Sequence, residues 1–527
     1  MPIVQQGSIN TTALVVPDLY VQIVPPQNLV LNGVPTDVIA MVGSAAWGPI
    51  GQAVIVGSMA EYAQNFGPIM PRKYDMGTQV ATAVQQGAQN FRCVRVSNGT
   101  DTAAQLGLFY NNSPNGPLVL TACYTGSYGN QVGGAFLAGS QPNTWRVSIT
   151  LPGFTPEVFD NIGGTGQAFW QNVVNAINNG QSTQRGPSRI VVASPGNSFT
   201  TMPTAGIFSF YYGTPGTDGA SSLNAAILVG SDVSPRRGMY ALRGQGCSIG
   251  VLADADDSTQ WTDQVQFGLS EGVYMICSGP AGDTISNAIS AKQAAGLDSY
   301  AAKLMFGDWI WWSDQVNSTV RLVSPQGFVA GRLGNLSPEQ SSLNKPLYGV
   351  IGTQNSGNPG TGQSNVYSDA DLQTMFGAGI DVIANPQPGG AYWGVRCGHN
   401  SSSNSAVDGD NYTRLTNYIA ATLAAGMGQY VGRLVNASLF QQIRATLLSY
   451  FQNLLQQGQL GSVDGSQPFS VICDTSNNPL SRTSLGYVQA DCQVQYQAIN
   501  EKFIVNVEGG QTVQVQRQTL PSGQVGG

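Results

Sequence analysis

The chain contains 527 residues, has a formal net charge of -7, and carries charged side chains at 10% of its positions. Ordinary soluble proteins carry charges at about a quarter of their positions, so uncharged polar residues and glycine must form much of this surface. No run of Lys and Arg occurs, which excludes the clustered cations typical of nucleic-acid-binding proteins. The length is sufficient for about three or four domains, each with its own hydrophobic core.

The first residues, MPIVQQGSINTT, lack the basic and apolar regions of a secretory signal. The most apolar uncharged stretch, residues 415–431, is interrupted by Thr, Asn, Gln and Tyr, whereas a membrane-spanning helix needs about 20 predominantly apolar residues. The sequence therefore predicts a protein that is not exported through a signal peptide and does not insert directly into a membrane.

Residues 1–30 are expected to form an extended N-terminal arm. Prolines and β-branched residues occur together there, which favours an edge strand over a helix. The apolar residues expected on this strand are Val15, Leu19, Val21 and Ile23. Residues 31–99 contain two apolar runs split by Gly and Pro, two expected helices and a compact strand, which predicts an α/β segment. This segment is expected to pack with the inner, C-terminal part.

The middle of the chain divides into two regions that differ in their pattern of apolar and polar residues. Residues 100–212 consist mainly of short apolar strands separated by Gly, Pro, Asn and Ser, a pattern typical of a β-sandwich or barrel. In residues 213–385, short apolar strands alternate with helices, which predicts a mostly parallel sheet covered on both faces. The predicted fold class is α/β plus β, with several domains.

The last region, residues 386–527, is predicted to be helical and then β. One helix is expected at 411–432. A second, at 438–458, is the most strongly patterned in the chain, with a capping box at Ser438 and Gln441 and a terminating Gly458. Its apolar stripe comprises Leu439, Ile443, Leu447, Phe451 and Leu454.

Residues 487–508 show the period-two alternation of strands with one buried face. The apolar parity changes near residues 500–502, which predicts the end of one strand and the start of another. The expected inward-facing residues are Val488, Ala490, Cys492, Val494 and Tyr496 in the first strand and Phe503, Val505 and Val507 in the second. The two glycines that follow predict a hairpin to a third strand.

Enzymatic activity is not expected, although one hydrolase-like pattern occurs. GCSIG at 246–250 fits G-x-S-x-G, and His399, the one histidine of the chain, follows it. A nucleophile elbow has a strand before its serine and a helix after it, whereas the apolar run after Ser248 predicts a strand. Neither a phosphate-binding loop nor a cysteine pair with zinc-site spacing occurs, so no cofactor is expected.

Several segments, taken together and in order, resemble the tail sheath proteins of contractile-tailed bacteriophages. They include VGSAAWGPIGQAVIVGSMAEYAQNFG (42–67), WIWWSD (309–314), SPQGFVAGRLGNLSPEQSSLNKPLYGV (324–350), WGVRCGHN (393–400) and CDTSNNP (473–479). Each motif is short, but the similarity runs over nearly the whole chain.

The resemblance implies a non-catalytic, subtilisin-like α/β core at 213–385, an inserted outer β-sandwich-like domain at 100–212, and an inner C-terminal α+β domain at 386–527. It also implies that copies of the chain stack helically around a tail tube, with baseplate, terminator and neck proteins as further partners. The arm and the C-terminal strands are then expected to complete sheets in neighbouring copies. Such an assembly is expected in the virion tail, put together in the host cytoplasm, where its contraction delivers the genome.

The resemblance makes Arg414, Arg433 and Arg444 candidates for contact with the tube. It also makes an inter-subunit disulfide possible, because Cys397 and Cys492 depart from the family pattern, although a buried free thiol is the ordinary role of such residues. Two alternatives stay open: the sheath of an R-type bacteriocin or another contractile injection system, and a serine hydrolase that uses Ser248 and His399.

Overall fold

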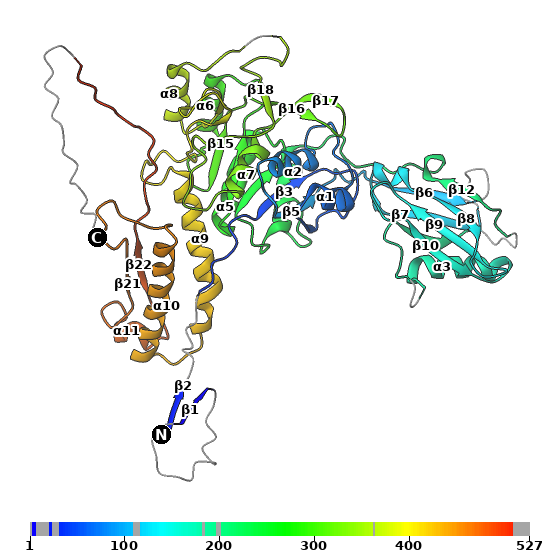
Figure 1. Cartoon of the computed structure of the whole chain (residues 1–527), viewed down its shortest axis with the longest axis horizontal. Coiled ribbons are helices and arrows are strands. Elements are labelled where there is room, and N and C mark those ends of the chain that lie inside the picture. Colours follow the sequence, from blue (N-terminus) through cyan, green and yellow to red (C-terminus); the bar gives the residue numbers. More distant parts are fainter. Residues whose placement is uncertain are drawn as a thin grey trace, which may run out of the picture.

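A computed structural model describes residues 3–6, 20–23, 31–108, 116–181, 185–196, 202–361 and 364–509. Three parts are distinguished in Figure 1: a central body (residues 31–99 and 218–409), a distal lobe (residues 100–217) that projects to one side, and a C-terminal subdomain (residues 410–509). Among the described helices, none combines the length and the hydrophobicity that crossing a bilayer requires.

The central body is built on a six-stranded sheet in which every neighbouring pair is parallel except β4 and β5. The strand order is β15 (Ala302–Met305), β14 (Tyr274–Ser278), β13 (Ile249–Leu252), β3 (Ile39–Gly43), β5 (Phe91–Arg95) and β4 (Ala53–Val56). The mixed α/β architecture with several domains agrees with the sequence prediction.

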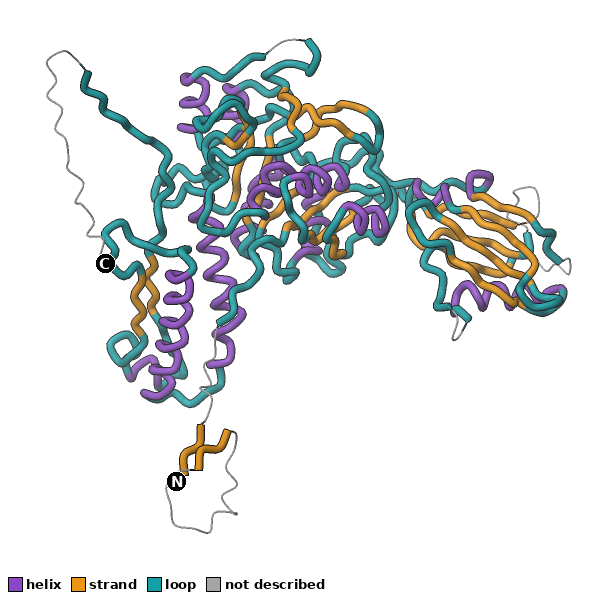
Figure 2. Tube along the Cα trace, in the orientation of Figure 1, coloured by secondary structure: helices purple, strands orange, loops and turns teal. Residues whose placement is uncertain are grey.

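Helices cover both faces of this sheet, as Figure 2 shows. One face carries α1 (Met59–Phe66), α2 (Met76–Gln85) and α7 (Gln326–Gly334). The other carries α4 (Ala225–Val229), α5 (Trp261–Glu271), α6 (Ile285–Ala294) and α8 (Asp369–Gly377). Successive residues of a strand point into the hydrophobic cores on opposite faces of the sheet. Ile39 and Met41 pack under α2 and α7, whereas Ala40 and Val42 pack under α5. Both faces of each strand are buried, which explains the unbroken apolar runs.

The sheet joins two regions that the sequence analysis separates. Strands β3, β4 and β5 come from residues 31–99, and β13, β14 and β15 come from residues 213–385. The expected boundary between these regions therefore does not separate two sheets, and 31–99 packs chiefly within the central body. Smaller sheets complete the body: β17 (Thr319–Val323), β16 (Ile310–Asp314) and β18 (Val350–Thr353), and β19 (Ile383–Ala384) with β20 (Gly394–Val395).

The distal lobe contains two antiparallel sheets and one long helix around a common core. One sheet is β10 (Glu157–Ile162), β9 (Trp145–Thr150), β8 (Gly133–Ala138) and β12 (Gly206–Ser209); the other is β11 (Val191–Pro195), β7 (Leu118–Thr125) and β6 (Ala103–Leu108). Helix α3 (Gly166–Asn179) contributes Phe169, Trp170 and Val173 to the core that both sheets share.

A loop of the central body is inserted into the base of the distal lobe. Trp47, which follows β3, is buried in the lobe core and lies edge-on to Tyr124 and Tyr128. Arg95, at the end of β5, is fully buried and donates to the carbonyl oxygens of Gly48 and Thr125 at 2.7 Å and of Asp218 at 3.3 Å. One guanidinium thus joins the inserted loop, the lobe and the chain returning from it, which ties the lobe to the body.

Replacing Arg95 with methionine is expected to loosen this connection. Two buried carbonyl groups and the partly buried carbonyl of Thr125 would lose a charged donor, at a cost of about 1–3 kcal/mol in the free energy of unfolding. Limited proteolysis should then cut the two lobe connections, near residues 97–103 and 213–219, faster than in the unmodified chain. Arg189→Met is the matched control, because Arg189 is exposed on the same lobe. Equal cleavage in both variants would show that Arg95 does not hold the lobe.

The C-terminal subdomain consists of helices α9 (Asp410–Met427), α10 (Ala437–Gln456) and α11 (Leu480–Thr483) and a two-stranded sheet of β21 (Phe469–Ile472) and β22 (Asp491–Val494). All five apolar stripe residues predicted for the second helix are buried in its core. The predicted capping box is wrong: Asn436, two residues earlier, caps the helix by accepting from the Leu439 amide at 2.9 Å.

At the N-terminus, β1 (Ile3–Gln6) pairs in parallel with β2 (Tyr20–Ile23). Val21 and Ile23 lie on β2, whereas Val15 and Leu19 lie outside the described residues. The hairpin expected after residue 509 also falls outside them.

Candidate functional site

The β21–β22 sheet presents two open edges. The strands pair antiparallel, with Phe469 opposite Val494 and Ile472 opposite Asp491. Among the described residues, no third strand pairs with either of them. A strand whose outer N–H and C=O groups have no strand partner is a template for pairing with another chain. The sheet therefore has the geometry to accept a further strand on either side.

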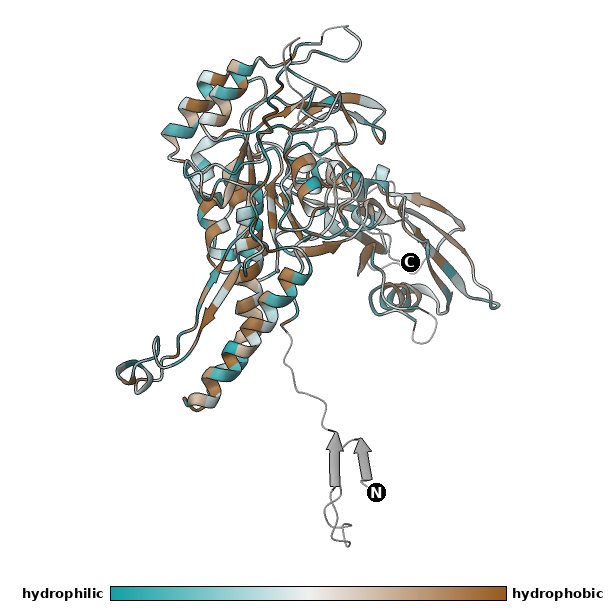
Figure 3. Ribbon diagram, turned by 60° about the vertical axis from the view of Figure 1, so that its left-hand side comes forward, coloured by the Kyte–Doolittle hydropathy of each residue, from teal (hydrophilic) through white to brown (hydrophobic). Residues whose placement is uncertain are grey.

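One face of this sheet and its flanking residues packs on the helices, as the alternation predicts. Figure 3 shows hydrophobic and hydrophilic residues alternating around α9 and α10 beside the strands. The residues packed against the subdomain core are those of one parity: Val488, Ala490, Cys492, Val494 and Tyr496. The predicted strand is too long, however, because only Asp491–Val494 has a ladder partner. Apolar and polar residues continue to alternate in the irregular backbone on either side of β22. Their alternation reflects which side chains are buried against the helices, not which residues pair in a sheet.

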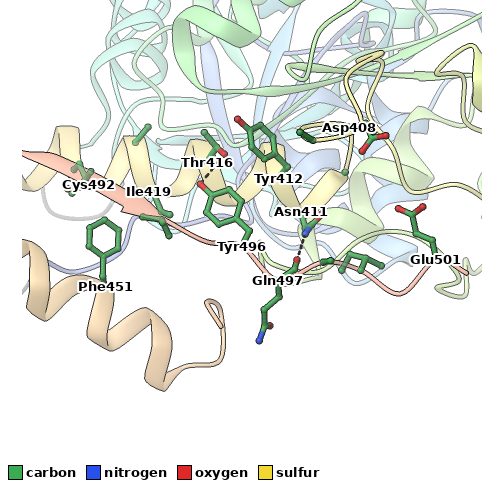
Figure 4. A pocket seen from close by; sticks show the side chains of 18 residues that line it. Asp408, Asn411, Tyr412, Thr416, Ile419, Phe451, Cys492, Tyr496, Gln497 and Glu501 are labelled. Carbon is green, nitrogen blue, oxygen red and sulfur yellow. Dashed lines mark hydrogen bonds between the residues drawn. The ribbon is translucent and has the colours of Figure 1, made fainter. Parts of the chain in front are cut away.

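The chain beyond β22 runs along α9, where it borders a groove of about 730 Å³ (Figure 4). The Gln495 amide donates to the Pro468 carbonyl at 2.7 Å. The Asn411 side chain donates to the Gln497 carbonyl at 3.1 Å, and the Tyr496 and Thr416 hydroxyls lie 3.1 Å apart. The last two contacts hold Tyr496 and Gln497 against the first turns of α9.

The segment Phe503–Val507 makes no such contacts with the described part of the chain. Phe503, Ile504, Val505 and Val507 are 82%, 81%, 63% and 85% exposed, and the segment forms no strand. No strand among the described residues lies beside this segment, so the expectation that Phe503, Val505 and Val507 pair with a neighbouring copy stays a prediction. A run of exposed, β-branched and aromatic residues of this kind marks an interaction site.

A buried ionic cluster fixes the start of α9 to the central sheet. The Lys303 ammonium on β15 lies 2.7 Å from an oxygen of Asp381 and 3.1 Å from one of Asp410, the first residue of α9. Asp410 also accepts from the Tyr274 hydroxyl at 2.6 Å and from Ser342. Burial opposes these charges, but the opposite charges outweigh it, so the pKa of Asp410 lies below and that of Lys303 above the usual value.

The three arginines expected at the tube differ in exposure. Arg433 and Arg444 are exposed, on the α9–α10 connection and on α10. Arg414 is 5% exposed and donates to the carbonyl oxygens of Leu336 at 2.8 Å and Ser337 at 3.0 Å. Its assignment as a tube-facing residue is therefore wrong, because its guanidinium is already committed to the interior of the chain, and burial lowers its pKa to about 10.

Ser248 and His399 do not form a hydrolase site in the described part of the chain. The Ser248 hydroxyl donates to the Thr36 and Val38 carbonyls at 2.8 and 3.0 Å, and the residue precedes β13 instead of following a strand. His399 Nε2 lies 2.7 Å from Glu501 and Nδ1 lies 3.5 Å from Asp408. Neither side chain is positioned as a nucleophile and its base.

All seven cysteines are free thiols in the single chain. Burial raises the pKa of both Cys397 and Cys492, each of which is partly buried. A raised pKa lowers the thiolate fraction that attacks a disulfide. The cross-link between copies stays a prediction, which electrophoresis of assembled material with and without reductant would test.

No protein-family model and no curated protein matches the chain, but solved structures resemble it over most of its length. A sheath tail protein from Desulfitobacterium hafniense superposes with a TM-score of 0.57 at 13% identity, covering 86% of this chain and 93% of that one. A sheath tail protein from Listeria innocua also gives 0.57 at 13% identity, with 84% and 90% covered. The chain has the fold of sheath tail proteins. The helical sheath of the anti-feeding prophage in its contracted state gives 0.55 at 11% identity, with 94% and 99% covered.

Because 94% of the chain is covered in that comparison, the sheath fold is not confined to the central body. Sequence patterns did not reveal the buried pairing of Lys303 with Asp410. They also did not reveal the contacts of Asn411 and His399 with the C-terminal segment. One sequence feature pointed to Lys303: it is a lone charge in the otherwise apolar run of β15, AKLM, where a parallel strand is buried on both faces.

Proposed function

We propose that the chain is the structural subunit of a contractile tail sheath, which polymerises helically around an inner tube and shortens to drive that tube through a cell envelope. The observation that carries this proposal is the likeness, over nearly the full length, to a protein described as a helical sheath in its contracted state. In this proposal the central body is a subtilisin-like core without catalytic activity, and the distal lobe is a β-sandwich-like domain on the outside of the sheath.

Copies of the chain are held together by strand addition. The open edges of β21 and β22 and the exposed segment Phe503–Val507 support this step, since one offers unpaired backbone groups and the other an unpaired apolar strand. The N-terminal residues Val15, Leu19, Val21 and Ile23 are proposed to add a second strand. When the arms of one copy reach two different neighbours, the contact is head-to-tail and does not close, so it builds a helix.

Contraction follows from rigid bodies joined by flexible connections. The bodies exchange one set of contacts for another while the added strands keep them linked, which gives the lattice two packings. The extended packing is the less stable of the two and is held by a kinetic barrier until the baseplate releases the first ring. Stored packing free energy drives the change, and no nucleotide or other cofactor is required.

The proposed partners are further copies of the chain, a tail tube protein, a baseplate, and terminator or neck proteins. Similarity to a chain of the anti-feeding prophage baseplate, with a TM-score of 0.53 at 11% identity, supports the baseplate contact. The proposed setting is a bacteriophage tail that delivers a genome, assembled in the host cytoplasm. A bacteriocin or injection-system sheath is the second candidate, favoured by likeness to an extracellular contractile injection system at a TM-score of 0.53. Capsid and portal genes beside this one would identify the phage.

Electron microscopy of the purified full chain tests the proposal. We expect striated hollow cylinders, some of them shortened and widened, at protein concentrations well above those that keep the chain monomeric. Monomers at every concentration, both alone and mixed with the tube protein of the same particle, would refute the sheath assignment.

Reversing the charge of two exposed arginines is expected to weaken binding to the tube. The double variant Arg433→Glu with Arg444→Glu reverses the only charges that the described residues place on α10 and on the α9–α10 connection. If α10 faces the tube, this reversal should reduce the number of tubes that carry a sheath. Cosedimentation with preformed tubes should fall about tenfold while tube-free assembly persists. Arg236→Glu, an exposed change on the central body, is the control. Unchanged cosedimentation of the double variant would place the tube contact elsewhere.

A further inference from the structure

After β22, side-chain contacts hold the chain against the rest of the molecule as far as Glu501, and the chain is exposed from Phe503. Tyr496 stacks edge-on against Tyr412 of α9, with ring centroids 5.8 Å apart, and Tyr412 in turn lies 5.9 Å from Tyr300 of the central body. Among the described residues, Glu501 is the last whose side chain pairs with the body, and Phe503 is already 82% exposed. The point at which the chain departs is thus defined by the contact that holds Glu501.

His399 makes that contact. Its Nε2 lies 2.7 Å from Glu501 Oε1, and its Nδ1 lies 3.5 Å from Asp408 Oδ2 on the loop before α9. The Nε2–Glu501 contact has the length of a hydrogen bond, in which a protonated ring nitrogen donates to the carboxylate. The backbone of the same residue is fixed from the other side, because its carbonyl accepts from the buried Lys303 ammonium at 2.8 Å. His399 therefore joins the C-terminal segment to the ionic cluster of the central sheet.

We propose that His399 is the positioning residue that sets where the C-terminal segment leaves the body and how far it reaches into a neighbouring copy of this chain. This proposal rests on the sheath function proposed above. An extended chain spans at most about 3.3–3.6 Å per residue, so Val507, six residues beyond Glu501, lies at most about 20–22 Å from that anchor. With Glu501 released, the next anchor is Gln497, held by Asn411, and the four extra residues add about 14 Å of slack. His399 thus limits the register in which the segment pairs with a neighbouring strand.

Trypsin provides a local measure of this anchor, since Lys502 lies directly beside Glu501. In His399→Ala, cleavage after Lys502 in the unassembled full chain is expected to become about fivefold to tenfold faster, because the segment opens more often. Cleavage after Arg433 and Arg482, exposed in the same subdomain, serves as the internal control and should stay unchanged. A general loss of stability would accelerate all three.

Two further variants separate an anchoring role from a merely structural one. Glu501→Ala should reproduce the faster cleavage without altering the histidine, whereas Glu508→Ala, an exposed carboxylate further along the segment, should not. His399→Gln, which keeps one donor, should restore part of the protection. Unchanged cleavage after Lys502 in both His399→Ala and Glu501→Ala would overturn the proposal. If the unmodified chain forms no cylinders, the sheath function fails, while the cleavage rates still decide whether His399 anchors the segment.

Discussion

Replacing Lys303 with methionine is expected to destabilise the chain by about 3–5 kcal/mol, the cost typical of removing one partner from a buried ion pair. Lys303 is fully buried, and its ammonium is shared by Asp381 and Asp410, which are 1% and 0% exposed at their side chains. Methionine fills a similar volume but leaves two carboxylates in the interior without a cation. Urea unfolding followed by tryptophan fluorescence, together with the yield of soluble protein, measures the effect.

Lys73→Met is the matched control for this substitution. Lys73 also pairs with an aspartate at 2.7 Å, but its side chain is 45% exposed, and exposed ion pairs contribute at most about 1 kcal/mol. The two variants remove the same charge and add the same side chain, so their difference isolates burial. Equal destabilisation by both would contradict the structural role assigned to the cluster.

The cluster is also expected to be insensitive to pH over a wide range. The lowered pKa of Asp410 means that its stabilising contribution is present above the ordinary aspartate pKa of about 3.9 and is lost as the pH falls below it. The raised pKa of Lys303 means that its contribution is present below about 10.4 and is lost only as the pH rises above that. The contribution of the cluster to the stability of the unmodified chain should therefore stay constant between about pH 5 and pH 9. In Lys303→Met, burial raises the pKa of the Asp410 carboxyl, which has lost its cation, so the difference in stability between the two chains should narrow as the pH falls.

Local periodicity in the sequence predicted those parts of the fold that neighbouring residues determine. The stripe Leu439 to Leu454 forms one face of α10, and the apolar run around Ile39–Gly43 is a strand buried on both faces. Both features need only the period of the element and the side that faces a core. They do not depend on which distant segment supplies the partner.

Pairing between distant segments and the use of buried charge were not predictable in this way. The alternation in β3 does not reveal that its neighbour is β13, so the pairing of residues 31–99 with the central sheet was not predicted. Arg414 was assigned to a tube-facing surface although it is buried with polar partners, and no role was predicted for Asp410, which is also buried. The segment Phe503–Val507 was predicted as a strand because its composition favours one, but a strand requires a second chain segment beside it, and the described residues supply none there.

A chain that ends at Lys502 is expected to lose the ability to polymerise. The deletion removes the exposed segment Phe503–Val507 and leaves β22, its contacts with α9 and the Glu501 anchor in place. In the proposed assembly this segment supplies the backbone hydrogen bonds that link copies. Electron microscopy should show no cylinders, while the thermal unfolding midpoint stays that of the full chain. A variant that ends at Gly509 is the control and should assemble.

Two single substitutions test whether the segment enters a sheet as a strand. Side chains of a strand alternate between faces, so Val505 and Asn506 point to opposite sides of any sheet that accepts the segment. Val505→Asp places a carboxylate on the apolar side, where burial without a partner is strongly unfavourable, and should reduce the yield of cylinders about tenfold or more. Asn506→Asp introduces the same charge one residue away on the polar side and should assemble normally. Equal yields from the two variants, or cylinders from the chain that ends at Lys502, would show that copies are joined by contacts between bodies instead of by an added strand.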